Sequence, residues 1–176
     1  YVTKYLIAVS ECLRTAQGSD NGYMDMRGVS LTGMYALQMH QTPSGRLFNY
    51  GDAAETQEAA RYVGNLFSLQ RRFPSMGPGA GVVGRRWLRS GAVNASGTAG
   101  WDEIVIALMR WSKEGTAADV RALPHAAFYP AKGVGAIRNG WQNDSAYLGA
   151  KGGDSAATHQ DLDHGSLVWE THGYRW

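Results

Sequence analysis

The stretch AYLGAKGGDSAATHQDLDHGS, residues 146–166, places a short apolar run directly before a polar segment that glycines bound. The run at 146–150 is typical of a β-strand, and residues 165–170 form a second strand-like run. The segment between them, 151–166, holds two histidines and three aspartates. A loop at a strand edge can present an imidazole to a cleft while nearby carboxylates fix its tautomer. A solvated hairpin with incidental histidines is the alternative interpretation.

Helical patterns dominate the chain before Pro124, and strand-like patterns follow it. Apolar residues recur at helical spacing in several segments. The predicted helices cover residues 2–15, 29–40, 52–70, 84–90 and 101–111. The predicted strands cover residues 134–138, 146–150 and 165–170. Because helices precede strands instead of alternating with them, the sequence predicts an α+β protein with either segregated layers or two domains. We place the boundary near residue 124, between residues 1–124 and 125–176.

Shorter signals refine this outline. Asp52 and Glu55 have the spacing of a capping box at the start of a helix. Residues 47–50 fit either a strand or an extended loop, and the Gly/Pro-rich segment 74–81 predicts a loop. Cys12, the only cysteine, lies in an apolar helical pattern and is expected to be a small buried side chain.

The composition argues against several functional classes. The 17 basic residues nearly balance the 15 acidic ones and form no Lys/Arg run, which argues against a nucleic-acid arm. One cysteine excludes a disulfide framework or a thiolate metal cluster within this chain. No apolar run approaches the length of a membrane span. The abundant Trp and Tyr residues are compatible with a sugar-binding surface, because aromatic faces suit carbohydrate rings.

Both ends of the sequence lie inside predicted secondary structure, as if the chain had been cut there. A helical pattern starts at once, without a capping residue before Tyr1, and residues 167–176 end inside strand-like sequence. We therefore expect an internal fragment of a larger protein.

Several short motifs follow one another in a definite order. The segment GRLFNYGD lies at 45–52, and AFYP at 127–130 precedes IRNGW at 137–141. The K-G-G-D motif at 151–154 then leads to His159, to DHGS at 163–166 and to GYRW at 173–176. This ordered set resembles the heparinase II/III-like polysaccharide lyases, and the resemblance spans nearly the whole chain.

The resemblance implies the C-terminal helices of an (α/α) toroid over residues 1–124 and the start of an antiparallel β-sandwich over residues 125–176, with the active site between them. Enzymes of this family cleave uronic-acid polysaccharides by β-elimination, so the implied partner is an anionic polysaccharide and not a nucleic acid. A bacterial periplasmic, secreted or cell-surface location is also implied. The substrate, the choice of exo or endo action and the oligomeric state are not.

β-Elimination needs relief of the charge on the C5 carboxyl group, a base for the C5 proton and an acid that protonates the leaving O4. In the family an Asn or His, a Tyr and a His share these tasks, and no cofactor is required for catalysis. His159 inherits the role of the last histidine by its place after the K-G-G-D motif. The catalytic Tyr and the Asn or His are expected upstream of Tyr1, so the fragment alone is expected to be inactive.

Three more residues are candidates for other roles. Some relatives carry H-x-H, whose second histidine helps to bind a structural metal such as zinc; here that position is Asp161, and a carboxylate can also ligate zinc. Asp163 is expected either to orient His159 or to cap the turn into the next strand. Arg138, on a predicted strand, could bind a substrate carboxylate bidentately or form a structural salt bridge.

Two other functions stay open. A non-catalytic carbohydrate-binding relative could keep this fold without the chemistry, and the aspartate at position 161 is the feature that favours it. A metal-dependent hydrolase could instead use His159, Asp161, Asp163 and His164, although these residues crowd into one loop.

Overall fold

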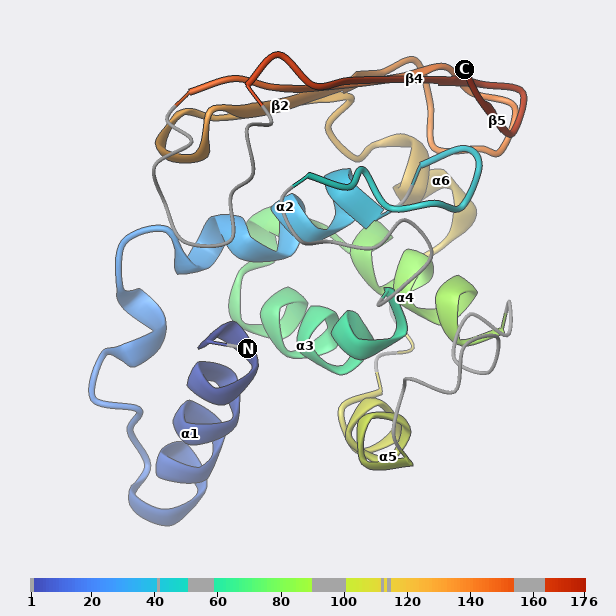
Figure 1. Ribbon diagram of the computed structural model, residues 1–176. Helices are drawn as coiled ribbons and strands as arrows, with labels where there is room; N and C mark the ends of the chain where they lie inside the picture. Colours follow the sequence, from blue (N-terminus) through green and yellow to red (C-terminus); the bar gives the residue numbers. More distant parts are fainter. Residues whose placement is uncertain are drawn as a thin grey trace.

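An antiparallel β-sheet lies across a layer of helices in the computed structural model (Figure 1). The structure describes residues 2–40, 42–50, 59–89, 101–111, 113, 115–153 and 164–176. The α-helices are α1 (Val2–Gln17), α2 (Val29–His40), α3 (Ala59–Arg72), α4 (Gly79–Arg89), α5 (Trp101–Met109) and α6 (Ala117–Arg121). Short 3₁₀ helices cover Tyr23–Asp25, Pro74–Met76 and Pro130–Lys132.

The sheet is a meander in which each strand pairs antiparallel with the next. Its strands are β1 (Ala126–Tyr129), β2 (Val134–Arg138), β3 (Tyr147–Lys151), β4 (Leu167–Thr171) and β5 (Tyr174–Arg175). The register aligns Arg138, Tyr147, Glu170 and Arg175 in one row across β2 to β5. Because paired residues share a face of a sheet, these four side chains all lie on the same side.

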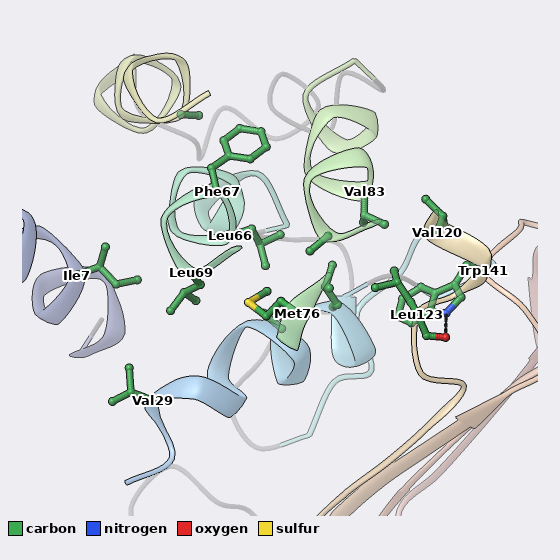
Figure 2. Close-up of a cluster of buried hydrophobic side chains, with 14 of the residues drawn as sticks. Ile7, Val29, Leu66, Phe67, Leu69, Met76, Val83, Val120, Leu123 and Trp141 are labelled. Atoms are coloured by element: carbon green, nitrogen blue, oxygen red, sulfur yellow. Dashed lines mark hydrogen bonds between the residues drawn. The ribbon is translucent and has the colours of Figure 1, made fainter. Parts of the chain in front are cut away.

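A core of apolar side chains holds the helices together (Figure 2). Leu66, Phe67 and Leu69 of α3 lie at its centre, and each is at most 2% exposed. Trp141, from the turn after β2, reaches into the same core and donates its indole N–H to the carbonyl oxygen of Leu123 over 3.3 Å. This Trp therefore ties the sheet to the helical layer.

A second, smaller core lies between the sheet and helix α2. Met39 from α2 and Phe48 from the segment after it pack against Val134, Ala136 and Tyr147 of β2 and β3. All five side chains are at most 6% exposed. This core fixes the inner face of the sheet on α2, which lies directly beneath it in Figure 1.

Much of the predicted outline is confirmed. Helix α2 has the predicted bounds, and the predicted strands 134–138, 146–150 and 165–170 correspond to β2, β3 and β4 within two residues. The chain changes from helix to strand between Arg121 and Ala126, as expected near Pro124. The division into two separate domains stays a prediction. No helix among the described residues is long and apolar enough to cross a membrane.

Other predictions were wrong, and one lies outside the described residues. Residues 74–81 were expected to form a loop, but helix α4 begins inside this segment at Gly79. Strand β1 was not predicted from the sequence pattern. Residues 47–50 form an extended loop without strand pairing, which agrees with one of the two predicted alternatives. Cys12 is exposed, not buried. The capping box of Asp52 and Glu55 lies outside the described residues.

Gly79 shows why α4 starts where it does. A Cβ atom at this position would lie 2.5 Å from the carbonyl oxygen of Asp119 in α6, so only glycine allows this close approach of α4 to α6. The tertiary contact outweighs the poor helix propensity of glycine.

We predict that Gly79→Ala lowers the free energy of unfolding by about 1–3 kcal/mol, because the added methyl group must push α4 away from the backbone of α6. Urea denaturation followed by circular dichroism measures the change. Ser30→Ala, at an exposed position on α2, is the matched control and is expected to change stability by less than about 0.5 kcal/mol. Equal stability of the two variants would contradict the close packing of α4 on α6.

Candidate functional site

The loop between β3 and β4 carries most of the predicted site residues. His159, Asp161 and Asp163 all lie outside the described residues, which stop at Gly153 and resume at His164. The two ends of the loop are held together. The backbone N–H of Lys151 donates to the carbonyl oxygen of Ser166 over 2.9 Å, and that of Gly165 donates to the carbonyl oxygen of Lys151 over 2.8 Å. The loop therefore leaves the sheet and returns to it at one point, between the end of β3 and the start of β4.

The turn between β1 and β2 packs against the base of this loop. The backbone N–H of Gly152 donates to the carbonyl oxygen of Gly133 over 2.6 Å. Gly133 has a φ of 58°, and a Cβ atom there would collide with the carbonyl oxygen of Gly152. Both features require glycine at 133. The second glycine of the K-G-G-D motif, Gly153, has a φ of 77° and turns the chain out of the sheet.

Lys151, the first residue of the K-G-G-D motif, has a structural role. Its side chain lies on the inner face of the sheet and is 2% exposed. The ammonium group donates to the carbonyl oxygen of Gly152 over 2.6 Å. Because a buried ammonium needs such acceptors, Lys151 stiffens the point from which the loop departs.

Arg138 lies between the sheet and α2 and is 5% exposed. Its Nε donates to the side-chain oxygen of Gln38 and its Nη2 to the backbone carbonyl of the same residue, each over 3.0 Å. The guanidinium carbon lies 3.9 Å from the ring centre of Trp141 and 4.9 Å from that of Tyr147. Burial lowers the pKa of Arg138 to about 10, so the group stays charged near neutral pH. These contacts favour a structural role for Arg138, and its binding of a substrate carboxylate stays a prediction.

Arg175 and Glu170 form a buried ion pair under the sheet. Nε and Nη2 of Arg175 lie 2.8 and 2.6 Å from Oε1 of Glu170, which is fully buried. Nη2 also donates to the carbonyl oxygen of Leu47 over 2.8 Å, and Nη1 to Oδ1 of Asn49 over 3.2 Å. The other carboxylate oxygen of Glu170 accepts the backbone N–H of Ser44 over 2.9 Å. This pair therefore binds the segment 42–50 to the far edge of the sheet.

Phe48 connects the same segment to β3. A Cβ atom at Gly149 would lie 2.7 Å from the ring of Phe48, so the ring covers the backbone of the strand directly. The motifs GRLFNYGD, YLGAKGGD and GYRW, far apart in the sequence, thus meet under one part of the sheet.

Two tyrosine hydroxyl groups point into this interface. Neither Tyr129 nor Tyr147 has a hydrogen-bond partner for its hydroxyl group among the described residues. Burial raises the pKa of both phenols, and the nearby charge of Arg138 opposes that shift. Tyr129 packs edge-on against Tyr35 with 5.0 Å between ring centres. Both tyrosines are therefore neutral near pH 7.

Sequence reasoning missed Glu170 and the contacts of Arg175. Alternation along β4 gives the signal, because it places Glu170 on the face opposite Trp169. Among the described residues no group of three or more His, Cys, Asp or Glu side chains could hold a metal ion. The possible zinc ligand Asp161 lies outside those residues and stays a prediction.

We predict that Arg175→Ala lowers the free energy of unfolding by about 3–5 kcal/mol, because it leaves the buried carboxylate of Glu170 without its cation. Urea denaturation provides the measurement. Asp25→Asn breaks the exposed pair between Asp25 and Arg72 and is expected to cost less than about 1 kcal/mol. A small loss for Arg175→Ala would show that the ion pair does not hold the segment 42–50.

His40 provides a pH-dependent prediction. It ends α2 and lines a cavity of about 150 Å³ with Lys4, Tyr35 and Asn65. Burial lowers the pKa of His40 from 6.5 to about 4. Between these values the unfolded chain binds a proton that the folded chain does not, so stability falls as the pH drops from 6.5 towards 4.

We expect this loss to be on the order of 2 kcal/mol and to be absent in His40→Gln. The free energy of unfolding should be measured at several pH values between 7 and 4.5 for both proteins. His172→Gln, at an exposed turn position, should keep the wild-type slope. The idea fails if His40→Gln and the wild type lose stability in parallel.

Comparison with known proteins gives a likeness of fold. No family model and no curated protein matches the chain. A solved structure of heparinase III matches with a TM-score of 0.55 and 17% identity, over 99% of this chain and 23% of that one. A second heparinase III structure, with methylated lysines, matches with a TM-score of 0.53 and 17% identity, over 98% of this chain and 23% of that one. The chain thus spans about a quarter of the length of these structures. At this identity the match supports the fold alone: the chain is an α+β protein with a heparinase-like fold.

Proposed function

We propose that this chain is part of a polysaccharide lyase that cleaves uronic-acid polysaccharides by β-elimination. The observation that carries the proposal is the meeting of the family-like motifs under the sheet. Phe48 covers Gly149, and Arg175 binds both Leu47 and Asn49. Motifs that match a family only by chance would have no reason to contact one another in the fold. The heparinase-like fold supports the same proposal.

In this proposal His159 takes part in the proton transfers. A base removes the C5 proton of the uronate, the electron pair forms the C4–C5 double bond, and the C4–O4 bond breaks. The leaving O4 takes up a proton from an acid. The imidazole of His159 is suited to either transfer, because its usual pKa lies close to neutral pH.

The described residues around the loop supply rigidity. Lys151, Gly133 and Ser166 fix both ends of the loop through hydrogen bonds, and Glu170 with Arg175 fixes the segment 42–50 beside them. A positioned histidine needs such support, since small displacements of a catalytic group cost large factors in rate. Asp163 is proposed to orient His159, and a periplasmic, secreted or cell-surface location would bring the enzyme to its polymer.

The test uses the intact enzyme that contains this chain, with a panel of heparan sulfate, alginate and other polyuronates. Ultraviolet absorbance reports the double bond of the product. We expect His159→Ala to lower turnover by about 100-fold or more while the melting temperature stays unchanged. His125→Ala, at an exposed position before β1, should retain wild-type turnover.

The other outcomes discriminate between the candidate functions. Absorbance that stays flat on the whole panel, with a folded protein that still binds the polymers, would favour a non-catalytic carbohydrate-binding relative. Products without a double bond, together with loss of activity on chelation, would favour a metal-dependent hydrolase. Wild-type turnover of His159→Ala would remove this residue from the mechanism.

A further inference from the structure

A groove of about 930 Å³ opens between helices α1, α3 and α5. Its lining residues come from α1, from the segment that follows it at Met24, from the C-terminal half of α3 and from the end of α5. None of them belongs to the sheet or to the segment 42–50. The size falls within the range of small-ligand sites in proteins. The groove is therefore separate from the loop between β3 and β4.

Arginines dominate the charge of this groove. Arg14, Arg71, Arg72 and Arg110 line it, and Glu11 is its one acidic residue among the described ones. The carboxylate of Glu11 lies 2.6 Å from Arg110 and 3.8 Å from Arg71. Asp25 pairs with Arg72. Among the described residues, four guanidinium groups thus face two carboxylates, an excess of two positive charges.

The excess positive charge lies towards Arg14 and Arg71. The Arg71 side chain is 53% exposed, and its one acidic neighbour among the described residues is Glu11 at 3.8 Å. Arg14 is exposed, and no described acidic group lies within ion-pair distance of it. Planar guanidinium groups bind carboxylate and sulfate oxygens with two parallel hydrogen bonds, so this pair is suited to an oxyanion.

Ser10 gives a second, independent indication of a ligand. It lines the groove, yet it is only 2% exposed, and its hydroxyl group has no hydrogen-bond partner among the described residues. Buried hydroxyl groups are rarely left unpaired in folded proteins. Ser10 lies one helical turn before Arg14 on α1, so both side chains share a face of that helix.

Apolar side chains complete the walls. Ala8 of α1 and Ile106 and Met109 of α5 line the groove. Such walls suit the C–H faces of a sugar ring, while the arginines suit the acidic substituents of the ring. A simple inorganic anion would leave the apolar walls unused.

We infer that this groove is a non-catalytic subsite for an acidic oligosaccharide. Arg14 and Arg71 bind its carboxylate or sulfate groups, and Ser10 accepts a hydrogen bond from a sugar hydroxyl or donates one to it. The choice of an oxyanion rests on the groove itself, whereas the choice of a saccharide rests on the proposed function. The subsite would hold a polymer segment at a distance from the loop that carries His159.

Isothermal titration calorimetry on the intact protein that contains this chain tests the inference without any need for turnover. The probes are a heparin-derived tetrasaccharide, a tetragalacturonate, the neutral cellotetraose and sodium sulfate. We expect an acidic tetrasaccharide to bind, and cellotetraose and sulfate to bind at least about tenfold more weakly, since each loses one of the two kinds of contact. Added salt should weaken the binding, because the arginines are partly exposed.

Variants locate the binding in the groove. Arg14→Gln combined with Arg71→Gln should weaken it by about tenfold or more, and Ser10→Ala by about two- to fivefold. Arg27→Gln, at an exposed arginine outside the groove, should leave it unchanged. Circular dichroism and melting temperature confirm that each variant is folded.

Equal binding of sulfate and the acidic tetrasaccharides would overturn the inference, as would wild-type affinity of the double arginine variant or no binding at all. Because the readout is affinity, loss of this subsite and failure of the lyase proposal are distinguishable. An enzyme without β-elimination activity could still bind through Arg14 and Arg71, and a lyase could work without the subsite.

Discussion

The buried carboxylate of Glu170 is the group on which the sheet side of the structure depends. It accepts hydrogen bonds from Arg175 on the neighbouring strand and from the backbone of Ser44, which precedes the extended segment under the sheet. Arg175 in turn holds the carbonyl group of Leu47 and the side chain of Asn49. A buried charge is tolerated only with partners of this kind, so the segment 42–50 and the edge of the sheet must fold together.

The same constraint explains the unusual polarity of the sheet. The inner row contains Arg138, Glu170 and Arg175, whereas the outer face carries Phe128 (69% exposed), Trp169 (44%) and Trp176 (78%). The charged side chains of this row face the protein, whereas Phe128, Trp169 and Trp176 face away from it. The inner charges are satisfied by one another, by Gln38 and by backbone carbonyl groups, while the rings of Trp141 and Tyr147 cover Arg138. This row of the inner face therefore forms a polar network beside the apolar core, and it favours one register of the sheet over others.

This network also explains why the positions of some candidate site residues could not be predicted from the sequence. For Arg138 the sequence left substrate binding and a structural salt bridge open, because nothing local indicates that Gln38, a hundred residues earlier, accepts its hydrogen bonds. The K-G-G-D motif suggests that Lys151 belongs to a loop. The structure instead places it on the inner face of β3, where it holds the start of the loop between β3 and β4. His159, Asp161 and Asp163 follow from the order of motifs along the chain, and their roles stay predictions. The sequence did not predict the groove between α1, α3 and α5, because its arginines lie far apart along the chain, from Arg14 to Arg110.

The sequence by itself determined the periodic elements. The bounds of α2 and the strands β2 to β4 follow from apolar spacing and turn residues, since these preferences act over a few neighbouring positions. Only the tertiary structure decided that Gly79 begins a helix, that Ala126–Tyr129 forms an edge strand, and that Arg175 and Glu170 bind the segment 42–50. Each of these features depends on a partner far away in the chain, such as the backbone of Asp119, the strand β2 or the carbonyl group of Leu47. Local preference carries no information about such a partner, and only the packed fold brings it into contact.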